Sequence, residues 1–234
     1  MTRWPKRDWL ARVKAATQNA TSWCLLSDVF HVKQAADLPK LAEYGEILAT
    51  RGIEHGLIGP RERDRLWERH LLNCAVVATD YELLPTESTV IDVGSGAGLP
   101  GIIWALCRPD LRVTLVESLL RRSQFLVDVV AELGIASRVD VIRGRAEELT
   151  DLRADVVTAR AVAPLPRLLL WLRPLMHTDG QLVLLKGDKA AAEVAVTVEL
   201  ATSLGLGQAQ IMQIAGEGLN QPTTVVRYRQ HDAV

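Results

Sequence analysis

A run of glycines after a short apolar segment is the clearest candidate ligand site in the sequence. Residues 90–99 read Val-Ile-Asp-Val-Gly-Ser-Gly-Ala-Gly-Leu, with glycines at Gly94, Gly96 and Gly98. Because glycine has no Cβ atom, such a loop can turn sharply and approach a ligand closely. Packing alone could explain glycines in a strand-to-helix turn, but three alternate glycines directly after a strand favour ligand binding.

The acidic residue Asp92 narrows the choice of ligand. Gly96, Gly98 and Gly101 formally satisfy the dinucleotide-binding pattern. A carboxylate at Asp92 would repel a pyrophosphate, whereas it attracts the ammonium group of S-adenosylmethionine. Glu117 ends the next expected strand, where a carboxylate can bond ribose hydroxyls. A dinucleotide and S-adenosylmethionine both contain a ribose, so Glu117 does not distinguish between these two ligands. Taken alone, Glu117 could also be a solvated acid in a loop.

Two later segments are expected at the same edge of the fold. Residues 145–148 (Arg-Ala-Glu-Glu) follow the third expected strand, and residues 158–161 (Thr-Ala-Arg-Ala) follow the fourth. The acids Glu147 and Glu148 are as compatible with stabilising a helix N-terminus as with function. Arg160 stands between alanines after an apolar strand, which predicts a carboxylate or phosphate partner for its guanidinium.

Charged residues of both signs crowd a segment ahead of the first expected strand. They are Arg61, Glu62, Arg63, Asp64, Arg65, Glu68 and Arg69. Their spacing favours a solvated, salt-bridged helix face. His70 follows them directly. The pattern is equally consistent with two roles for His70, a site residue or a buried, hydrogen-bonded residue.

Hydrophobic periodicity predicts the elements that would position these residues. Strands are expected at residues 89–93, 113–116, 139–142, 155–158 and 181–185, with an antiparallel pair at 210–214 and 223–228. Helical patterns separate the first five strands. This alternation predicts an α/β fold with a doubly wound sheet, in which ligands bind at the carboxyl ends of the strands.

Two helices are expected before the first strand. Leu38, Leu41, Tyr44 and Leu48 have helical spacing, and Gly52 is expected to end that helix. Pro60 begins the second helix, with Trp67, Leu71, Cys74 and Ala78 on one face. We therefore predict three parts: a weakly structured extension over residues 1–34, a helical cap over residues 35–84, and a Rossmann-like domain over residues 85–234.

Composition excludes several classes of protein. The chain has 234 residues, 48% hydrophobic and 24% charged, which suits one sizeable α/β domain. Its apolar runs are too short for a membrane span and its first ten residues do not form a signal peptide, so a cytoplasmic location without membrane contact is expected. Three cysteines and five histidines are scattered without metal-ligand spacing, so no metal is expected. The net charge of -1 does not indicate a globally basic nucleic-acid binder, although a local patch can steer RNA.

With these segments placed, the chain resembles the ribosomal RNA small-subunit methyltransferase G family, also called glucose-inhibited division protein B. The matching stretches occur in family order at residues 69–72, 90–101, 117–119, 145–148, 158–161 and 185–187. Residues 57–66 depart from the Trp-Asn…Asn-Leu-Thr stretch of many members and look like the actinobacterial branch. The resemblance implies a class I S-adenosylmethionine-dependent methyltransferase fold, with seven strands, the last antiparallel, and a short N-terminal helical cap.

The resemblance also implies an activity, namely methylation of N7 of a single guanine in 16S ribosomal RNA. S-adenosylmethionine would be the cofactor, S-adenosylhomocysteine its product, and 16S ribosomal RNA or the small ribosomal subunit the partner of a monomeric enzyme. Gly94, Leu99, Ala146, Glu147 and Arg160 occupy the family's cofactor-binding positions. The glycine-loop pattern adds Asp92, Gly96, Gly98 and Glu117 to this expected site.

Guanine N7 carries a free lone pair, so its methylation needs no general base. Catalysis would depend on positioning and exclusion of water, with Arg160, Lys186 and His70 as candidates to hold guanine O6 or a phosphate. Residues 160–164 contain no Asn-Pro-Pro-Tyr-type motif, which disfavours methylation of an exocyclic amine. The alternatives are a small-molecule methyltransferase, a non-catalytic adenosyl-binding ribosome-assembly module and, third, an NAD-linked oxidoreductase.

Overall fold

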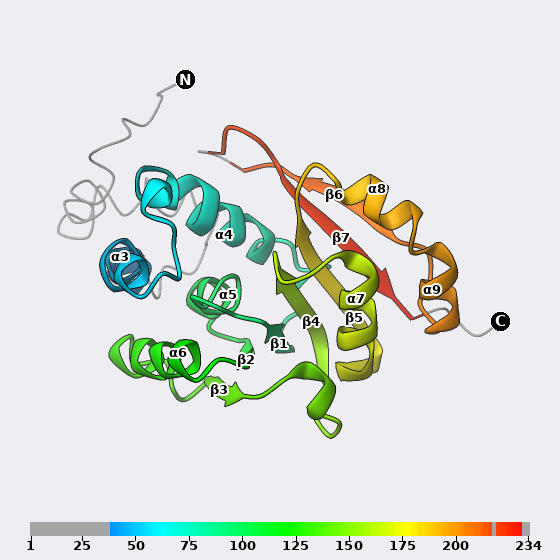
Figure 1. The fold of residues 1–234 in the computed structure, drawn as a ribbon, viewed down its shortest axis with the longest axis horizontal. Coiled ribbons are helices and arrows are strands. Elements are labelled where there is room, and N and C mark those ends of the chain that lie inside the picture. The colour runs from blue at the N-terminus through cyan, green and yellow to red at the C-terminus, as the bar shows by residue number, and fades with distance from the viewer. Residues whose placement is uncertain (1–37, 217–218, 231–234) are drawn as a thin grey trace.

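The computed structural model describes residues 38–216 and 219–230, and within them a seven-stranded sheet forms the centre of the molecule (Figure 1). The strand order is β3-β2-β1-β4-β5-β7-β6. The first five strands pair in parallel, whereas β7 is antiparallel to both β5 and β6. The strands are β1 Thr89–Val93, β2 Arg112–Glu117, β3 Val139–Arg143, β4 Ala154–Arg160, β5 Met176–Lys186, β6 Gln210–Ile214 and β7 Thr223–Arg229.

This topology confirms the predicted doubly wound α/β fold and its antiparallel terminal strands. Strand β5 is longer than predicted because it begins at Met176, in a polar stretch without apolar alternation. Gly180 permits close passage there, since a Cβ atom on it would lie 2.8 Å from the carbonyl oxygen of Asp155 on β4. The predicted extension at residues 1–34 lies outside the described residues, and the three-part division stays a prediction.

Helices cover both faces of the sheet (Figure 1). The cap consists of α3 Leu38–Ile47, η1 Leu48–Gly52, η2 Pro60–Arg65, η3 Trp67–Leu72 and α4 Asn73–Ala78. The remaining helices are α5 Gly101–Cys107, α6 Leu120–Glu132, η4 Ala146–Glu148, α7 Leu165–Leu172, η5 Arg173–Leu175, α8 Ala190–Ala195 and α9 Val198–Ser203. No helix among the described residues is long and apolar enough to span a bilayer.

The element η1 ends at the predicted residue, Gly52, but the chain does not leave the helical conformation there. Helical backbone continues through Glu54, and the turn comes at Gly56, which has a φ of +68°. The amide of Leu57 then donates to the carbonyl oxygen of Gly52 at 2.8 Å, as in a Schellman C-cap. A left-handed residue is what ends a helix in this way, and Gly52 does not adopt that conformation.

Two hydrophobic clusters lie on opposite faces of the sheet because side chains alternate along each strand. The cap, α5 and α6 pack with Val90 of β1 on one face, whereas α7, α8 and α9 pack with Ile91 on the other. The cap is also hydrogen-bonded to α5, since Trp104 Nε1 donates to the carbonyl oxygen of Cys74 at 3.0 Å. By the same alternation, Asp92 faces the cap side.

Candidate functional site

The loop between β1 and α5 has three glycines in left-handed backbone, at Gly94, Gly96 and Gly98. A Cβ atom on Gly94 would lie 2.7 Å from a methyl group of Val162, and one on Gly98 would lie 2.4 Å from Cδ1 of Ile102. Packing therefore requires these two glycines whatever the loop binds. Gly96 differs, because the nearest atom to its Cβ position is the carbonyl oxygen of Gly94, at 3.8 Å. The loop is thus open at Gly96.

Asp92 is completely buried beneath this loop. Its Oδ2 atom accepts a hydrogen bond from the amide of Gly101 at 3.0 Å, but Oδ1 has no partner among the described residues. Burial raises the pKa of Asp92 to about 7, an effect that the Gly101 amide and the nearby charge of Arg160 partly offset. A buried carboxylate oxygen without a donor is rare, and a cationic group would satisfy it.

Glu117 at the end of β2 is also buried, with 4% of its surface exposed. Its Oε2 accepts from the amide of Gly96 at 3.1 Å, and its Oε1 accepts from the amide of Leu119 at 3.0 Å. The solvated-acid interpretation of Glu117 is therefore wrong, because backbone amides hold the carboxylate against the glycine loop. Each oxygen still has a second lone pair, which leaves capacity for hydroxyl donors.

Arg160 projects from the end of β4 toward the cap. Its Nη2 lies 2.6 Å from Nδ1 of His70, and its Nη1 donates to Sγ of Cys74 at 3.5 Å. Among the described residues its partners are thus an imidazole and a thiol, whereas the sequence predicts a carboxylate or phosphate partner. Burial raises the pKa of Cys74 to about 11, so the thiol is neutral.

His70 lies part-buried between Arg160 and the cap acid Glu62. Its Nε2 is 3.2 Å from Oε2 of Glu62. Burial and the charge of Arg160 lower the pKa of His70 to about 4, although the hydrogen bond to Glu62 acts in the opposite direction. The imidazole is therefore neutral at physiological pH, and neighbouring side chains occupy both of its nitrogens.

Lys186 does not join this group. Its sequence neighbour Leu185 pairs with Arg160 across β5 and β4, so Lys186 points to the opposite face. There its ammonium lies 2.7 Å from Oε2 of Glu193 on α8, with 8% of the lysine side chain exposed. The same carboxylate oxygen accepts from the amide of Leu165 at 2.8 Å. The three catalytic candidates therefore divide into a pair, Arg160 and His70, and a separate lysine.

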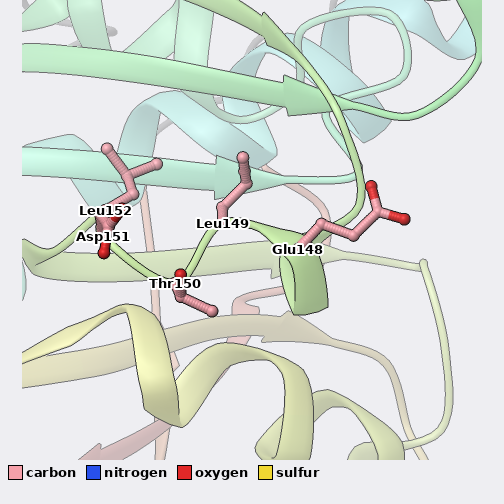
Figure 2. A pocket seen from close by; sticks show the side chains of 5 residues that line it. All are labelled: Glu148, Leu149, Thr150, Asp151 and Leu152. Atoms are coloured by element: carbon pink, nitrogen blue, oxygen red, sulfur yellow. The ribbon is translucent and has the colours of Figure 1, made fainter.

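The segment after β3 forms the short helix η4. Ala146 is buried, and Glu148 closes a capping box in which its Oε2 accepts from the amide of Arg145 at 3.4 Å. Glu147 is exposed. An open pocket with a volume of about 310 Å³ lies beside this helix and is lined by residues 148–152. Figure 2 shows these side chains, with Glu148 extending away from Leu152. The glycine loop, Glu117 and Arg160 do not line this pocket, so it is separate from the expected cofactor site.

Three residues at the site were not predicted from the sequence. Tyr44 of α3 donates its hydroxyl to the carbonyl oxygen of Ala97 at 2.7 Å and so supports the glycine loop from the cap. Cys74 and Glu62 contact Arg160 and His70, respectively. The sequence placed Tyr44 and Cys74 on apolar helix faces and Glu62 on a solvated one. No local pattern indicates the contacts of Tyr44 and Cys74, which join segments far apart in the chain, and the contact of Glu62 with His70 depends on the turn between η2 and η3.

Leu99 is buried at the end of the loop, and its amide donates to the carbonyl oxygen of Ser95 at 3.2 Å. The structure thus brings Asp92, Gly96, Glu117 and Arg160 to neighbouring strand ends, with Leu99 behind them. Ala146 and Glu147 follow β3, the strand next to β2. The arrangement provides carboxylates, an open backbone loop and one guanidinium at the carboxyl edge of a parallel sheet, where such folds bind ligands.

Solved structures with this fold include methyltransferases. The apo form of the S-adenosylmethionine-dependent methyltransferase SibL superposes with a TM-score of 0.58, at 18% identity, over 93% of this chain and 77% of that chain. The mitomycin 7-O-methyltransferase MmcR superposes with a TM-score of 0.56, at 17% identity, over 97% and 73%. At such low identity these matches establish the class I methyltransferase fold alone.

Other proteins have a much higher sequence identity to this chain than these solved structures do. Ribosomal RNA small subunit methyltransferase G from Salinispora tropica is 52% identical over 190 residues, covering 78% of this chain and 77% of the relative. The protein of the same name from Streptomyces coelicolor is 49% identical over 214 residues, covering 84% and 87%. The sequence profile described as GidB, rRNA small subunit methyltransferase G, matches residues 37–221. The chain therefore belongs to the rRNA small subunit methyltransferase G family, as its ordered motifs predicted.

Proposed function

We propose that the protein transfers a methyl group from S-adenosylmethionine to N7 of one guanine in 16S ribosomal RNA. Its relatives are named for methylation of small-subunit ribosomal RNA, and the family resemblance supplies the N7 position. Asp92, Gly94, Gly96, Gly98, Leu99, Glu117, Ala146, Glu147 and Arg160 would form the cofactor site. The proposal includes a monomeric enzyme that acts in the cytoplasm on the RNA or the small subunit.

The observation that carries the proposal is the buried Oδ1 of Asp92, which has no hydrogen-bond partner in the described part of the chain and lies beneath a loop that is open at Gly96. An ammonium group would give Oδ1 its missing donor, and Gly96 leaves room for a ligand against the backbone. Glu117 has lone pairs available for ribose hydroxyls. The residues present therefore fit S-adenosylmethionine better than NAD, whose pyrophosphate would lie near a carboxylate.

When bound, S-adenosylmethionine supplies an electrophilic methyl group on a sulfonium centre. Guanine N7 can attack such a group directly, so the protein has no proton to remove. The described residues agree with this requirement, because both nitrogens of His70 are engaged and Lys186 is paired with Glu193. Neither side chain is placed as a general base. Arg160, at the cap–sheet junction, is the cation best placed to hold an anionic group of the cofactor or of the RNA.

Two measurements test the proposal. Calorimetry should show that S-adenosylmethionine binds and that NAD does not, and tighter binding of NAD would contradict the cofactor assignment. Reductive cleavage mapping should then locate a single N7-methylguanine in 16S RNA treated with the wild-type protein. Methyl groups at N1 or N2, or transfer only to small acceptors, would contradict the assigned acceptor. Cofactor binding without transfer to any form of the RNA would favour a non-catalytic assembly module.

A further inference from the structure

A hydrogen-bonded chain of side chains crosses from the cap to the end of β4. Glu62 Oε2 lies 3.2 Å from His70 Nε2, and His70 Nδ1 lies 2.6 Å from Arg160 Nη2. Glu62 is further held by Arg69, whose Nη1 donates to Oε1 at 3.2 Å. The helices that supply Glu62 and His70 are thus connected to the guanidinium that the proposed function assigns to ligand binding.

The chemistry of the two outer groups dictates the protonation of His70. A guanidinium has only N–H donors, so the ring nitrogen that faces it, Nδ1, must carry the lone pair. The neutral ring therefore has its proton on Nε2, and this N–H donates to the carboxylate of Glu62. The lowered pKa of His70 agrees with that assignment, since protonation would place an N–H opposite another N–H. Glu62 thereby selects the tautomer that can accept from Arg160.

Arg160 receives a second, weaker restraint from Cys74. The thiol accepts from Nη1 while the imidazole accepts from Nη2, so both Nη atoms of the guanidinium are engaged from the cap side. A guanidinium has five N–H donors, and these two contacts leave donors for a ligand. An arginine that is restrained before the ligand arrives loses less conformational freedom on binding.

We propose that Glu62 and His70 are positioning residues that hold the Arg160 guanidinium in place at the carboxyl end of β4. This inference rests on the proposed function, because it assigns no ligand contact of its own to either residue. It predicts that removing the acceptor opposite Arg160 weakens the steps in which Arg160 takes part. It also predicts that a substitute which retains that acceptor restores them.

The first test compares substitutions by the acceptors they retain. His70→Phe keeps a ring of similar size without nitrogens, and should lower kcat/KM for RNA methylation or the affinity for S-adenosylmethionine by about tenfold, the effect of losing one hydrogen bond to a charged group. His70→Asn carries an oxygen near the position of Nδ1 and should recover most of that loss. The loss in Glu62→Ala should lie between the losses in His70→Phe and His70→Asn. Glu62→Gln keeps an acceptor for Nε2–H, so its loss should be small.

Asp64→Ala is the matched control, because Asp64 is an exposed acid on the same helix as Glu62. It should change neither activity nor cofactor affinity. Urea unfolding of every variant separates loss of fold from loss of positioning. The order of effects among folded variants is the decisive readout, since a purely structural role would not distinguish His70→Asn from His70→Phe by the acceptor they present.

The second test observes the imidazole directly and does not depend on catalysis. Two-dimensional ¹⁵N NMR of the full chain should show His70 as the neutral Nε2–H tautomer from about pH 5 to about pH 8, with its signal assigned by its loss in His70→Asn. Arg160→Met removes the guanidinium charge, so the pKa of His70 should rise. The groups that face the ring are Glu62, Arg160 and Arg69.

Three outcomes would overturn the inference: an Nδ1–H tautomer in the wild-type protein, an unchanged His70 pKa in Arg160→Met, or a folded His70→Phe variant with wild-type kinetics and cofactor affinity. If the proposed function is wrong, the methyl-transfer assay and the NMR experiment give a different combination of results. In that case the wild-type protein transfers no methyl group to the RNA, while the tautomer and its dependence on Arg160 still report on the hydrogen-bonded chain.

Discussion

The glycine loop allows a test in which the cost of folding and the cost of binding can be separated. Gly96 has a φ of +59°, and among the residues that the structure describes a Cβ atom on it meets only the carbonyl oxygen of Gly94, at 3.8 Å. Gly96→Ala therefore introduces no serious clash within the protein. Its cost to the fold is the left-handed conformation of a non-glycine residue, about 1–2 kcal/mol, which corresponds to roughly 2–8 °C in Tm for a chain of this size.

Cofactor binding should suffer separately in Gly96→Ala. If S-adenosylmethionine lies against the loop, the new methyl group enters space that the ligand needs. Forcing one extra methyl group into a packed contact costs about 1–3 kcal/mol. The dissociation constant should therefore rise by roughly 5-fold to 140-fold.

Gly134 provides the matched control. It follows α6, has a φ of +61°, and no atom of residues 38–216 or 219–230 lies within 4 Å of its Cβ position. Gly134→Ala should thus show a similar loss of stability but bind the cofactor as wild type does. Urea unfolding and isothermal titration calorimetry with S-adenosylmethionine measure the two quantities. Equal affinities for the cofactor in the two variants would refute the assignment of the open loop at Gly96 as the cofactor site.

Further predictions concern stability and pH. Gly98→Ala should destabilise the fold by more than about 3 kcal/mol in urea unfolding, because its Cβ atom would meet buried Ile102 and the left-handed backbone adds strain. The pKa of Asp92 is raised to about 7, so the unfolding free energy of the ligand-free protein should fall as pH rises from about 4 through 7, and Asp92→Asn should remove that fall. Affinity for S-adenosylmethionine should rise as Asp92 ionises, and calorimetry at pH values on either side of 7 checks this. Lys186→Met should cost about 1–2 kcal/mol in urea unfolding, because it leaves Glu193 without its ammonium partner in a partly exposed site. Single-turnover methyl transfer at saturating cofactor should be nearly flat from neutrality upward, and an inflection there that disappears in His70→Ala would make His70 a general base.

The order of elements could be predicted from local patterns alone. Strand alternation, the glycines at the end of β1 and the position of Pro60 each depend on near neighbours in the chain, and the structure confirms the fold they predict. The differences at the element boundaries have causes that the local pattern does not show. Gly52 lies inside a helix because its φ stays helical, and β5 begins early because pairing with β4 extends into a polar stretch.

The candidate site was only partly predictable. A residue at the carboxyl end of a parallel strand is identified from sequence by its position, and Asp92, Glu117 and Arg160 follow from that rule. The hydrogen-bond partners of these side chains cannot be predicted from that rule. Whether Arg160 meets a carboxylate or an imidazole depends on the register at which the cap packs on the sheet.

The fold, the family and the residues at the strand ends can be read from the sequence, because periodicity, glycine placement and the order of motifs are visible along the chain without knowledge of its contacts. The folded structure was needed to show that packing requires Gly94 and Gly98 while Gly96 is left open. It also shows that Lys186 pairs away from Arg160, and that Glu62 reaches Arg160 through His70. Some of these contacts join segments far apart in the chain, as between Arg160 and His70 or between Gly94 and Val162. The geometry of all of them depends on how the helices and loops pack around the sheet, which local patterns do not specify.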